Sequence, residues 1–465
     1  MAPPPPADAP SPAPNDAVSA VGTSPPARHR ALTVLAGSRS ALWAIAEYFG
    51  YPLLMFAATP LFLHLLGAVI YGQWMLLLTL TGLGGLAGMG MGTAATREVA
   101  SHLGRADREG AAAATRSCLG VTLAASGAIA SLIVLATLIA PINWLARMGD
   151  PNAIFAIALA GPMMIALEQV DTVFAGAIRG AERYDVSAKV ELTAKLTMVC
   201  ATVCAAALAH SLVAIITVTL LIMMGRSIVK AAVAKRLLRT TTLWPGWDKR
   251  HVATAFDFGK WTWAQAIGAA LFATADRLLV GGMMGAVALA HYSICVQLAQ
   301  QVQTLPAAGA QVLLPRVSRL ESEGISYRTM AVRVMLIVIA LAATFALGLA
   351  VVGGWLMQLW VGRAIATEMA TVLPFLALGY AVLGANVVPH YVLLGAGRAR
   401  FVALLNVAAG IVAIMVAWFL IPTLGFTGAA LGRFCYALVT SANIPVMLRQ
   451  TRGIDLRKKR EGVAS

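Results

Sequence analysis

The sequence predicts an all-α integral membrane protein with about twelve transmembrane helices, on two observations. Hydrophobic residues make up 59% of the chain and charged residues only 12%, with a mean hydropathy of +0.78, whereas a soluble domain carries about twice that charged fraction. The apolar residues gather into stretches of about 20, the length that crosses a bilayer core about 30 Å thick. The expected spans are 40–63, 70–95, 117–140, 153–178, 191–209, 211–232, 257–282, 285–312, 334–356, 370–394, 401–421 and 426–448.

Positive charge is distributed unevenly between these spans. All but four of the 35 lysines and arginines lie before the first span, in alternate loops such as 226–260, or after the last span. The exceptions are Arg147 and Arg363 in loops of the other side, and Arg277 and Arg433 within spans. Because positively charged loops stay in the cytoplasm, we expect both termini there. The same loops explain the net charge of +15 without a nucleic-acid partner.

The chain contains two halves with matching landmarks. Leu66-Gly67-Ala68-Val69 and Met284-Gly285-Ala286-Val287 each precede a span, at an offset of 218 residues, and Gly180-Ala181-Glu182-Arg183 and Gly395-Ala396-Gly397-Arg398 each follow one, at an offset of 215. Parallel repeats of this kind build transporters with a central site. The expected domains are a disordered cytoplasmic tail (1–39), a first six-helix bundle (40–232), a cytoplasmic linker (233–256), a second six-helix bundle (257–448) and a basic cytoplasmic tail (449–465).

Several short motifs occur along the chain. They are His64-Leu65-Leu66-Gly67 with Tyr71-Gly72, Gly90-Met91-Gly92, Arg97-Glu98-Val99-Ala100, residues 178–184, Phe258-Gly259, Asp276-Arg277, Pro315-Arg316-Val317-Ser318 and Leu420-Ile421-Pro422. Together these motifs resemble those of bacterial polysaccharide flippases. Their order spans nearly the whole chain after residue 40. The resemblance implies a V-shaped, alternating-access transporter of the superfamily that also holds the multidrug and toxin exporters. It implies an oligosaccharide on undecaprenyl pyrophosphate as the cargo.

Acidic residues within the spans are candidates for function because a charge in the membrane is costly. Glu47 lies in the first span, Glu168 and Asp171 lie on one side of the fourth, and Asp276 lies in the seventh. A buried carboxyl group can titrate, so these four residues are candidates for coupling to H⁺ or Na⁺. The alternative is that they pair with groups on neighbouring helices.

Arginines within or beside the spans are candidate ligands for the pyrophosphate, since charge interactions strengthen in a medium of low dielectric constant. They are Arg277, Arg433 and Arg179. Arg277 points about 100° away from Asp276 on an ideal helix, so the two cannot both face a central cavity squarely. Arg179 also fits a cytoplasmic anchor.

The eighth span carries a polar stripe that includes Gln297, Gln300 and Gln301. Amides both donate and accept hydrogen bonds, as sugar hydroxyls require. We therefore expect these glutamines to bind the sugars of the cargo, with interhelical hydrogen bonding as the alternative.

These features favour a flippase that moves undecaprenyl-pyrophosphate-linked oligosaccharides across the bacterial inner membrane for O-antigen, capsule or exopolysaccharide assembly. A cation-coupled multidrug exporter of the same superfamily is the alternative, which the internal acidic residues keep open. An enzyme is disfavoured because the outer loops are short and no glycine-rich nucleotide motif is present. We expect no catalytic residue, cofactor or metal. The expected partners are membrane lipid, the lipid-linked substrate, and polymerase and chain-length proteins.

Overall fold

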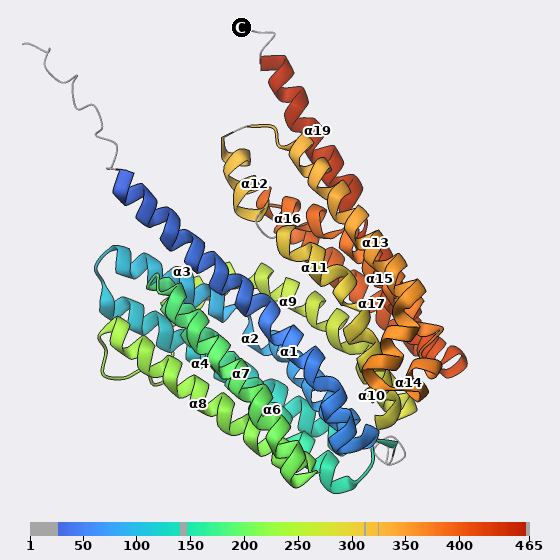
Figure 1. The fold of residues 1–465 in the computed structure, drawn as a ribbon. Helices are drawn as coiled ribbons and strands as arrows, with labels where there is room; N and C mark the ends of the chain where they lie inside the picture. The colour runs from blue at the N-terminus through green and yellow to red at the C-terminus, as the bar shows by residue number, and fades with distance from the viewer. Residues whose placement is uncertain (1–26, 140–146, 311–312, 324, 462–465) are drawn as a thin grey trace, which may run out of the picture.

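The structure is a computed structural model that describes residues 27–139, 147–310, 313–323 and 325–461, and most side chains from Leu54 to Arg452. All regular structure in these residues is helical (Figure 1). The all-α membrane fold predicted from composition is therefore confirmed. Residues 27–39, which we expected within an unstructured tail, are already helical.

The helices up to Leu238 pack around α6. They are α1 (Ala27–Gly82), α2 (Gly84–Gly88), α3 (Met91–Gly104), α4 (Arg108–Ile139), α6 (Pro151–Gly180), α7 (Tyr184–Ala209) and α8 (Leu212–Leu238). Helix α6 contacts α1, α3, α4 and α8. It begins where Asp150 accepts a hydrogen bond from the Asn152 amide and Pro151 occupies the first turn, a favourable start for a helix. We call this set of helices the first lobe.

The helices from Lys249 onward form a second lobe. They are α9 (Lys249–Met284), α10 (Ala286–Ala299), α11 (Gln301–Ala310), α12 (Leu313–Ser322), α13 (Arg328–Val361), α14 (Arg363–Glu368), α15 (Val372–Ala385), α16 (Val387–Gly395), α17 (Ala399–Leu424), α18 (Phe426–Thr440) and α19 (Asn443–Glu461). Helix α17 packs against α9 and α18, and α15 against α13 and α18. Helix α9 also contacts α1, α2, α3 and α4 of the first lobe, so it connects the two lobes.

Ten stretches among the described residues are long and apolar enough to cross a membrane. The count of twelve stays a prediction. The expected span 40–63 lies within α1 and the expected span 70–95 begins in it, and α1 is bent at Gly67. The expected span 285–312 is divided between α10 and α11. Helix α1 ends at Gly82 and a short α2 follows, and left-handed backbone at Met89 and Gly90 separates α2 from α3.

The internal repeat extends to the backbone conformation. Gly67 has φ 73° and ψ 169°, and Gly285, its counterpart, has φ 97° and ψ 179°. A residue with a side chain rarely adopts these angles. Both glycines therefore turn the chain into a following helical segment in the same way.

The turns after α6 and α16 also match. Glu182 and Gly397 are both left-handed, with φ 59° and φ 75°. In each turn the amide of the following arginine bonds to the carbonyl five residues earlier: Arg183 to Ile178 at 3.1 Å, and Arg398 to Leu393 at 2.9 Å. In the turn after α6, glutamate thus occupies a position whose left-handed backbone conformation favours glycine.

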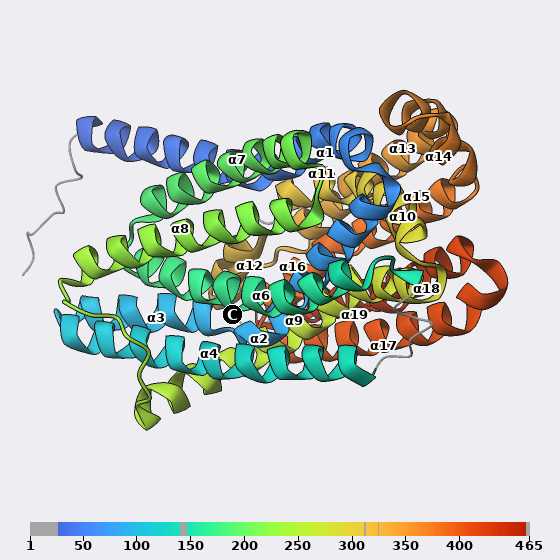
Figure 2. The same cartoon turned by 90° about the horizontal axis from the view of Figure 1, so that it is seen from below.

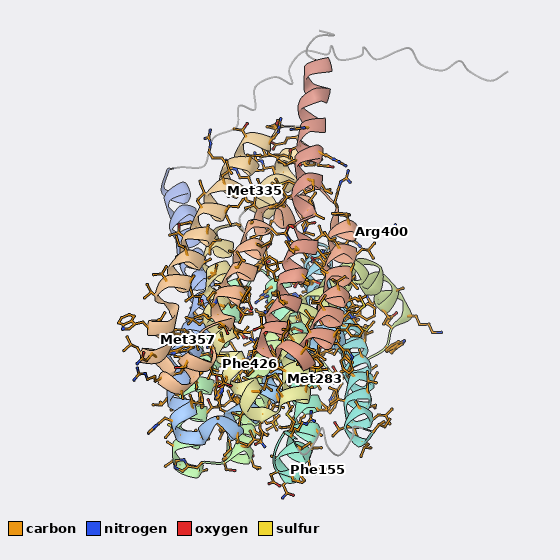
Figure 3. The ribbon with its side chains drawn as sticks, turned by 90° about the vertical axis from the view of Figure 1, so that its right-hand side faces the viewer. Phe155, Met283, Met335, Met357, Arg400 and Phe426 are labelled. Atoms are coloured by element: carbon orange, nitrogen blue, oxygen red, sulfur yellow. The ribbon has the colours of Figure 1, made fainter. Side chains whose placement is uncertain are left out.

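The lobes meet at one end and diverge at the other, giving the V-shaped arrangement of Figure 1. The start of α1 and the end of α19 lie on separate arms at the open end. Figure 2 shows α9 running between the lobes. In Figure 3, Phe155 lies at the end opposite α19, whereas Arg400 lies nearer the open end.

The closed end is held by contacts between α1 and the second lobe. A Cβ atom at Gly72 would overlap the carbonyl of Ala286, so the backbones of α1 and α10 touch. The rings of Phe56 and Trp360 stack with centroids 4.0 Å apart. The Trp360 indole also donates a hydrogen bond of 2.9 Å to the carbonyl of Phe56.

Replacing Glu182 with glycine should stabilise the protein. A left-handed non-glycine residue is strained by about 1–2 kcal/mol, and the added flexibility of the unfolded chain offsets about 0.4–1 kcal/mol of the gain. We expect a net gain of about 0.5–1 kcal/mol, seen as a higher midpoint of thermal unfolding in detergent. Glu182→Ala, which removes the same charge but keeps the strain, is the control and should show no gain. An equal gain from both variants would contradict this explanation.

Candidate functional site

A buried ion pair joins α9 and α18 inside the second lobe. The Nε atom of Arg433 donates to Oδ2 of Asp276 at 2.8 Å, and a terminal nitrogen donates to Oδ1 at 2.8 Å. Only 7% of Asp276 and 4% of Arg433 are exposed. This two-pronged geometry is the strongest form of a guanidinium–carboxylate contact. Each charge is therefore compensated within the protein.

Aromatic residues enclose this pair. The Tyr292 hydroxyl donates to Oδ2 of Asp276 at 2.7 Å, and Arg433 contacts the hydroxyl of Tyr380. The guanidinium lies 4.5 Å from the centre of the Phe272 ring, a distance typical of cation–π contacts. Tyrosines satisfy the polar atoms of the pair and exclude water from it.

A polar cavity of about 270 Å³ lies beside the ion pair in the second lobe. Its polar lining consists of Gln303, Asn386, His390, Tyr391, Asn406 and Thr440. Phe272 and Tyr436 also line it, and their ring centroids are 4.4 Å apart. The Oδ1 atom of Asn386 is buried and has no hydrogen-bond partner among the described residues, which is unusual for a buried polar atom.

Arg277 lies on another side of α9. Its guanidinium interacts electrostatically with Tyr71 of α1 and with Tyr380 of α15, which places it where the two lobes meet. Its Nε atom is buried and has no hydrogen-bond partner in the described part of the chain. Asp276, the adjacent residue, is already bound to Arg433.

The first lobe contains a larger network of charges. It comprises Glu168 and Asp171 of α6, Glu191 and Lys195 of α7, and Arg226 and Lys230 of α8. Arg226 lies 2.5 Å from Glu168 and 3.2 Å from Glu191, and Lys230 lies 2.5 Å from Asp171 and 2.6 Å from Glu191. Three carboxylates and three cations compensate one another, so the network links α6, α7 and α8 without net charge.

Arg226 and Lys230 were counted with the positive charges of the loop 226–260, although both also fall within the expected span 211–232. In the structure both lie within α8 and are 7% and 2% exposed. A hydropathy profile places the end of a predicted span where charged residues begin. It cannot distinguish a cation buried between helices from one that anchors a helix at the membrane surface. The spacing of four residues, which places both on one face of a helix, was the available signal.

The candidate residues of the fourth span separate in the structure. Glu168 and Asp171 bind Arg226. Arg179 lies in the last turn of α6, two turns further on and partly buried. Glu47 belongs to α1, but its side chain is outside the described part of the structure.

The three glutamines do not form one surface. Gln297 accepts a hydrogen bond of 3.0 Å from Thr59 of α1, across the lobe contact. Gln300 is exposed at the junction of α10 and α11. Gln301 lines a groove of about 370 Å³ between α10, α11 and α13 whose other lining residues are mostly apolar. The junction at Gln300 divides the stripe, and Gln303, not a candidate before, reaches the polar cavity.

The described residues also bring possible metal ligands together. Glu98, His102 and His251 offer ligand atoms within 4.8 Å of one another. They lie outside the candidate membrane spans, apart from both charged clusters. Cys200 and Cys204 are exposed on α7 and do not belong to this group.

Breaking the buried pair on one side should destabilise the protein strongly. Asp276→Asn leaves the Arg433 guanidinium uncompensated, at a cost of about 3–5 kcal/mol. The double variant Asp276→Asn/Arg433→Gln should lose less than the sum of the two single changes. Thermal unfolding in detergent measures these differences. Strictly additive losses would show that the two side chains do not depend on each other.

Neutralising the two α6 carboxylates of the first-lobe network, one at a time, should reduce the stability of the protein by different amounts. The Asp171 side chain is 3% exposed and contacts both Arg226 and Lys230, whereas that of Glu168 is 41% exposed and pairs with Arg226 alone. Asp171→Asn should cost about 3 kcal/mol, and Glu168→Gln less than about 1 kcal/mol. Equal shifts of the unfolding midpoint would contradict this ranking.

The fold is that of known transporters. An inward-facing multidrug resistance transporter of the MATE family and MOP superfamily has a TM-score of 0.62 at 15% identity, with 90% of this chain and 96% of that chain covered. An outward-facing structure of a MATE family transporter has a TM-score of 0.54 at 15% identity, with 90% and 96% covered. At these identities the likeness shows the fold alone.

Sequence comparison adds a more specific relationship. A Shigella flexneri protein named as an O-antigen transporter is 23% identical over 176 residues, which are 38% of this chain and 42% of that protein. The chain thus matches less than half of the length of this relative. Such relatives are transporters, not enzymes. Residues 114–367, more than half of the chain, match the sequence model of a family described as polysaccharide biosynthesis protein, and the chain belongs to this polysaccharide biosynthesis protein family.

Proposed function

We propose that this protein is a flippase that moves undecaprenyl-pyrophosphate-linked oligosaccharides across the bacterial inner membrane during assembly of a surface polysaccharide. Its family membership and transporter fold support movement of a polysaccharide precursor. The relative named as an O-antigen transporter supports a lipid-linked oligosaccharide as the cargo. Both termini are cytoplasmic in this proposal, as the positive loops require.

The observation that carries the proposal is the balance of charge in the membrane-embedded clusters. The carboxylates of Glu168, Asp171, Glu191 and Asp276 are all ion-paired. Arg277 adjoins the Asp276–Arg433 pair, and the described residues provide no ion pair for it. It therefore adds one positive charge to these otherwise balanced clusters. This balance favours an anionic cargo over the cationic cargo of a multidrug exporter.

Arg277 is our candidate for the pyrophosphate ligand. It lies near Tyr71 of α1 and Tyr380 of α15, and its Nε atom has no hydrogen-bond partner among the described residues. A cation in a medium of low dielectric constant strongly lowers the cost of an incoming anion. Arg433 is occupied by Asp276, so it can serve only after that pair rearranges. Arg179, at the end of α6, would act at the open end.

The sugars fit the polar cavity of the second lobe. Asn386, Asn406 and Gln303 supply amides, which pair with hydroxyl groups as donors and acceptors. Gln297 lies where α1 meets α10, and Gln300 is exposed at the end of α10. Both would contact sugars during passage.

The prenyl chain fits the groove between α10, α11 and α13. Leu298, Val302, Leu349 and Val352 line it, and such side chains favour contact with hydrocarbon. Gln301 at its wall would mark the transition from the lipid chain to the headgroup.

Transport then requires the closed end of the V to open. The arrangement described here opens toward the chain termini (Figure 1), which is the cytoplasmic side in this proposal. Rocking of the lobes must separate Phe56 from Trp360 and α1 from α10. Coupling to H⁺ or Na⁺ would act through Glu47, Glu168, Asp171 or Asp276. Glu168 is the most accessible of those described. A polymerase and a chain-length protein would act on the delivered cargo.

Flipping of undecaprenyl-pyrophosphate-linked oligosaccharide in proteoliposomes tests the proposal. We expect Arg277→Ala to reduce the initial rate at least about tenfold, since removal of one compensating charge costs more than about 1.4 kcal/mol. Arg277→Lys, which keeps the charge, should retain part of the activity. The control is Arg363→Ala, which removes the same charge at the first residue of α14.

Two results would contradict the proposal. Absence of flipping by the wild type, combined with export of cationic drugs, would identify a multidrug exporter. Flipping by Arg277→Ala at the wild-type rate would retain the function but exclude Arg277 as the anion ligand.

A further inference from the structure

Three possible metal ligands converge from two lobes of the molecule. Glu98 and His102 stand one turn apart on α3, and His251 lies in the first turn of α9. Their ligand atoms lie within 4.8 Å of one another, and the imidazole rings have centroids 5.4 Å apart. All three side chains are partly exposed, so an ion from solution can reach them.

A fourth residue fixes the orientation of His102. The Nδ1 atom of His102 lies 2.8 Å from Oδ2 of Asp107, and the Gly110 amide donates to the other oxygen at 2.8 Å. The Asp107 carboxylate accepts the Nδ1 proton of His102, which leaves the lone pair of the ring on Nε2. A carboxylate on the remote nitrogen is the usual outer partner of a metal-bound histidine.

We propose that Glu98, His102 and His251 form a binding site for one divalent transition-metal ion, with Zn²⁺ as the best-suited ion. Two imidazoles and one carboxylate suit zinc and its neighbours in the periodic table. Calcium and magnesium are disfavoured because they prefer oxygen ligands alone. Three protein ligands leave the fourth position of a tetrahedral ion for water.

The ligands need only a small movement to close around an ion. Zinc binds nitrogen and oxygen at about 2.0–2.2 Å, which separates ligand atoms in a tetrahedron by about 3.4 Å. The 4.8 Å limit exceeds this separation by about 1.4 Å, a difference that rotation of partly exposed side chains can close.

The site would fasten the start of α9 to α3. Helix α3 belongs to the first lobe, and α9 leads into the second. A bound ion would therefore hold the linker end of α9 to the first lobe while the remainder of the second lobe moves.

Zinc binding by tag-free, metal-stripped protein in detergent tests this site, independently of transport. Competition with a chromophoric chelator should give one Zn²⁺ per chain. His102→Ala and His251→Ala should each weaken binding at least about 100-fold, and Asp107→Asn about tenfold, the effect of losing an outer partner. Co²⁺ should give visible d–d absorption with the wild type and none with His102→Ala.

His64→Ala is the matched control because His64 is exposed on α1, away from these ligands, and it should bind Zn²⁺ like the wild type. Elution as a single symmetric peak in size-exclusion chromatography verifies folding of each variant. Absence of stoichiometric zinc binding by the wild type would overturn the proposal. Binding that is equally strong in both ligand variants would overturn it as well.

Discussion

A charge inside a membrane must be compensated by the protein, and this constraint determines which helices of the chain pack together. The lipid supplies neither counter-ions nor water. In the first lobe, the requirement brings α6, α7 and α8 into contact through Asp171, Glu191, Lys230 and their neighbours. In the second, it joins α9 to α18 through Asp276 and Arg433. Apolar packing alone would leave the rotation of these helices weakly specified, since lipid tails are as apolar as leucine.

The parts of the fold that could be predicted are those that depend on residue composition and on the spacing of motifs along the chain. The hydropathy of the chain gave the membrane class, and the matching sequences around Gly67 and Gly285 gave a repeat that the backbone angles share. These features are local, because a glycine that must adopt a positive φ is visible in the sequence itself.

Partners across helices could not be predicted in the same way. Asp276 was a candidate for ion coupling and Arg433 a candidate for cargo binding, but nothing in a single chain shows that residues 157 positions apart neutralise each other. Arg226 and Lys230 resembled loop cations because hydropathy averages over all faces of a helix. The glutamines of α10 and α11 were projected on an ideal helix, and the junction at Gln300 altered the direction of those beyond it.

The two lobes share a backbone plan but differ in how their interiors are stabilised. A network of six charged groups links α6, α7 and α8 in the first lobe, whereas the second lobe holds one buried ion pair beside a cavity. A dense network of opposite charges resists deformation, and a cavity permits side chains to reorganise. The first lobe is therefore the more rigid of the two, and the second is the more deformable. In a transporter built in this way, the second lobe would adjust to the cargo, and the first would move as a rigid body.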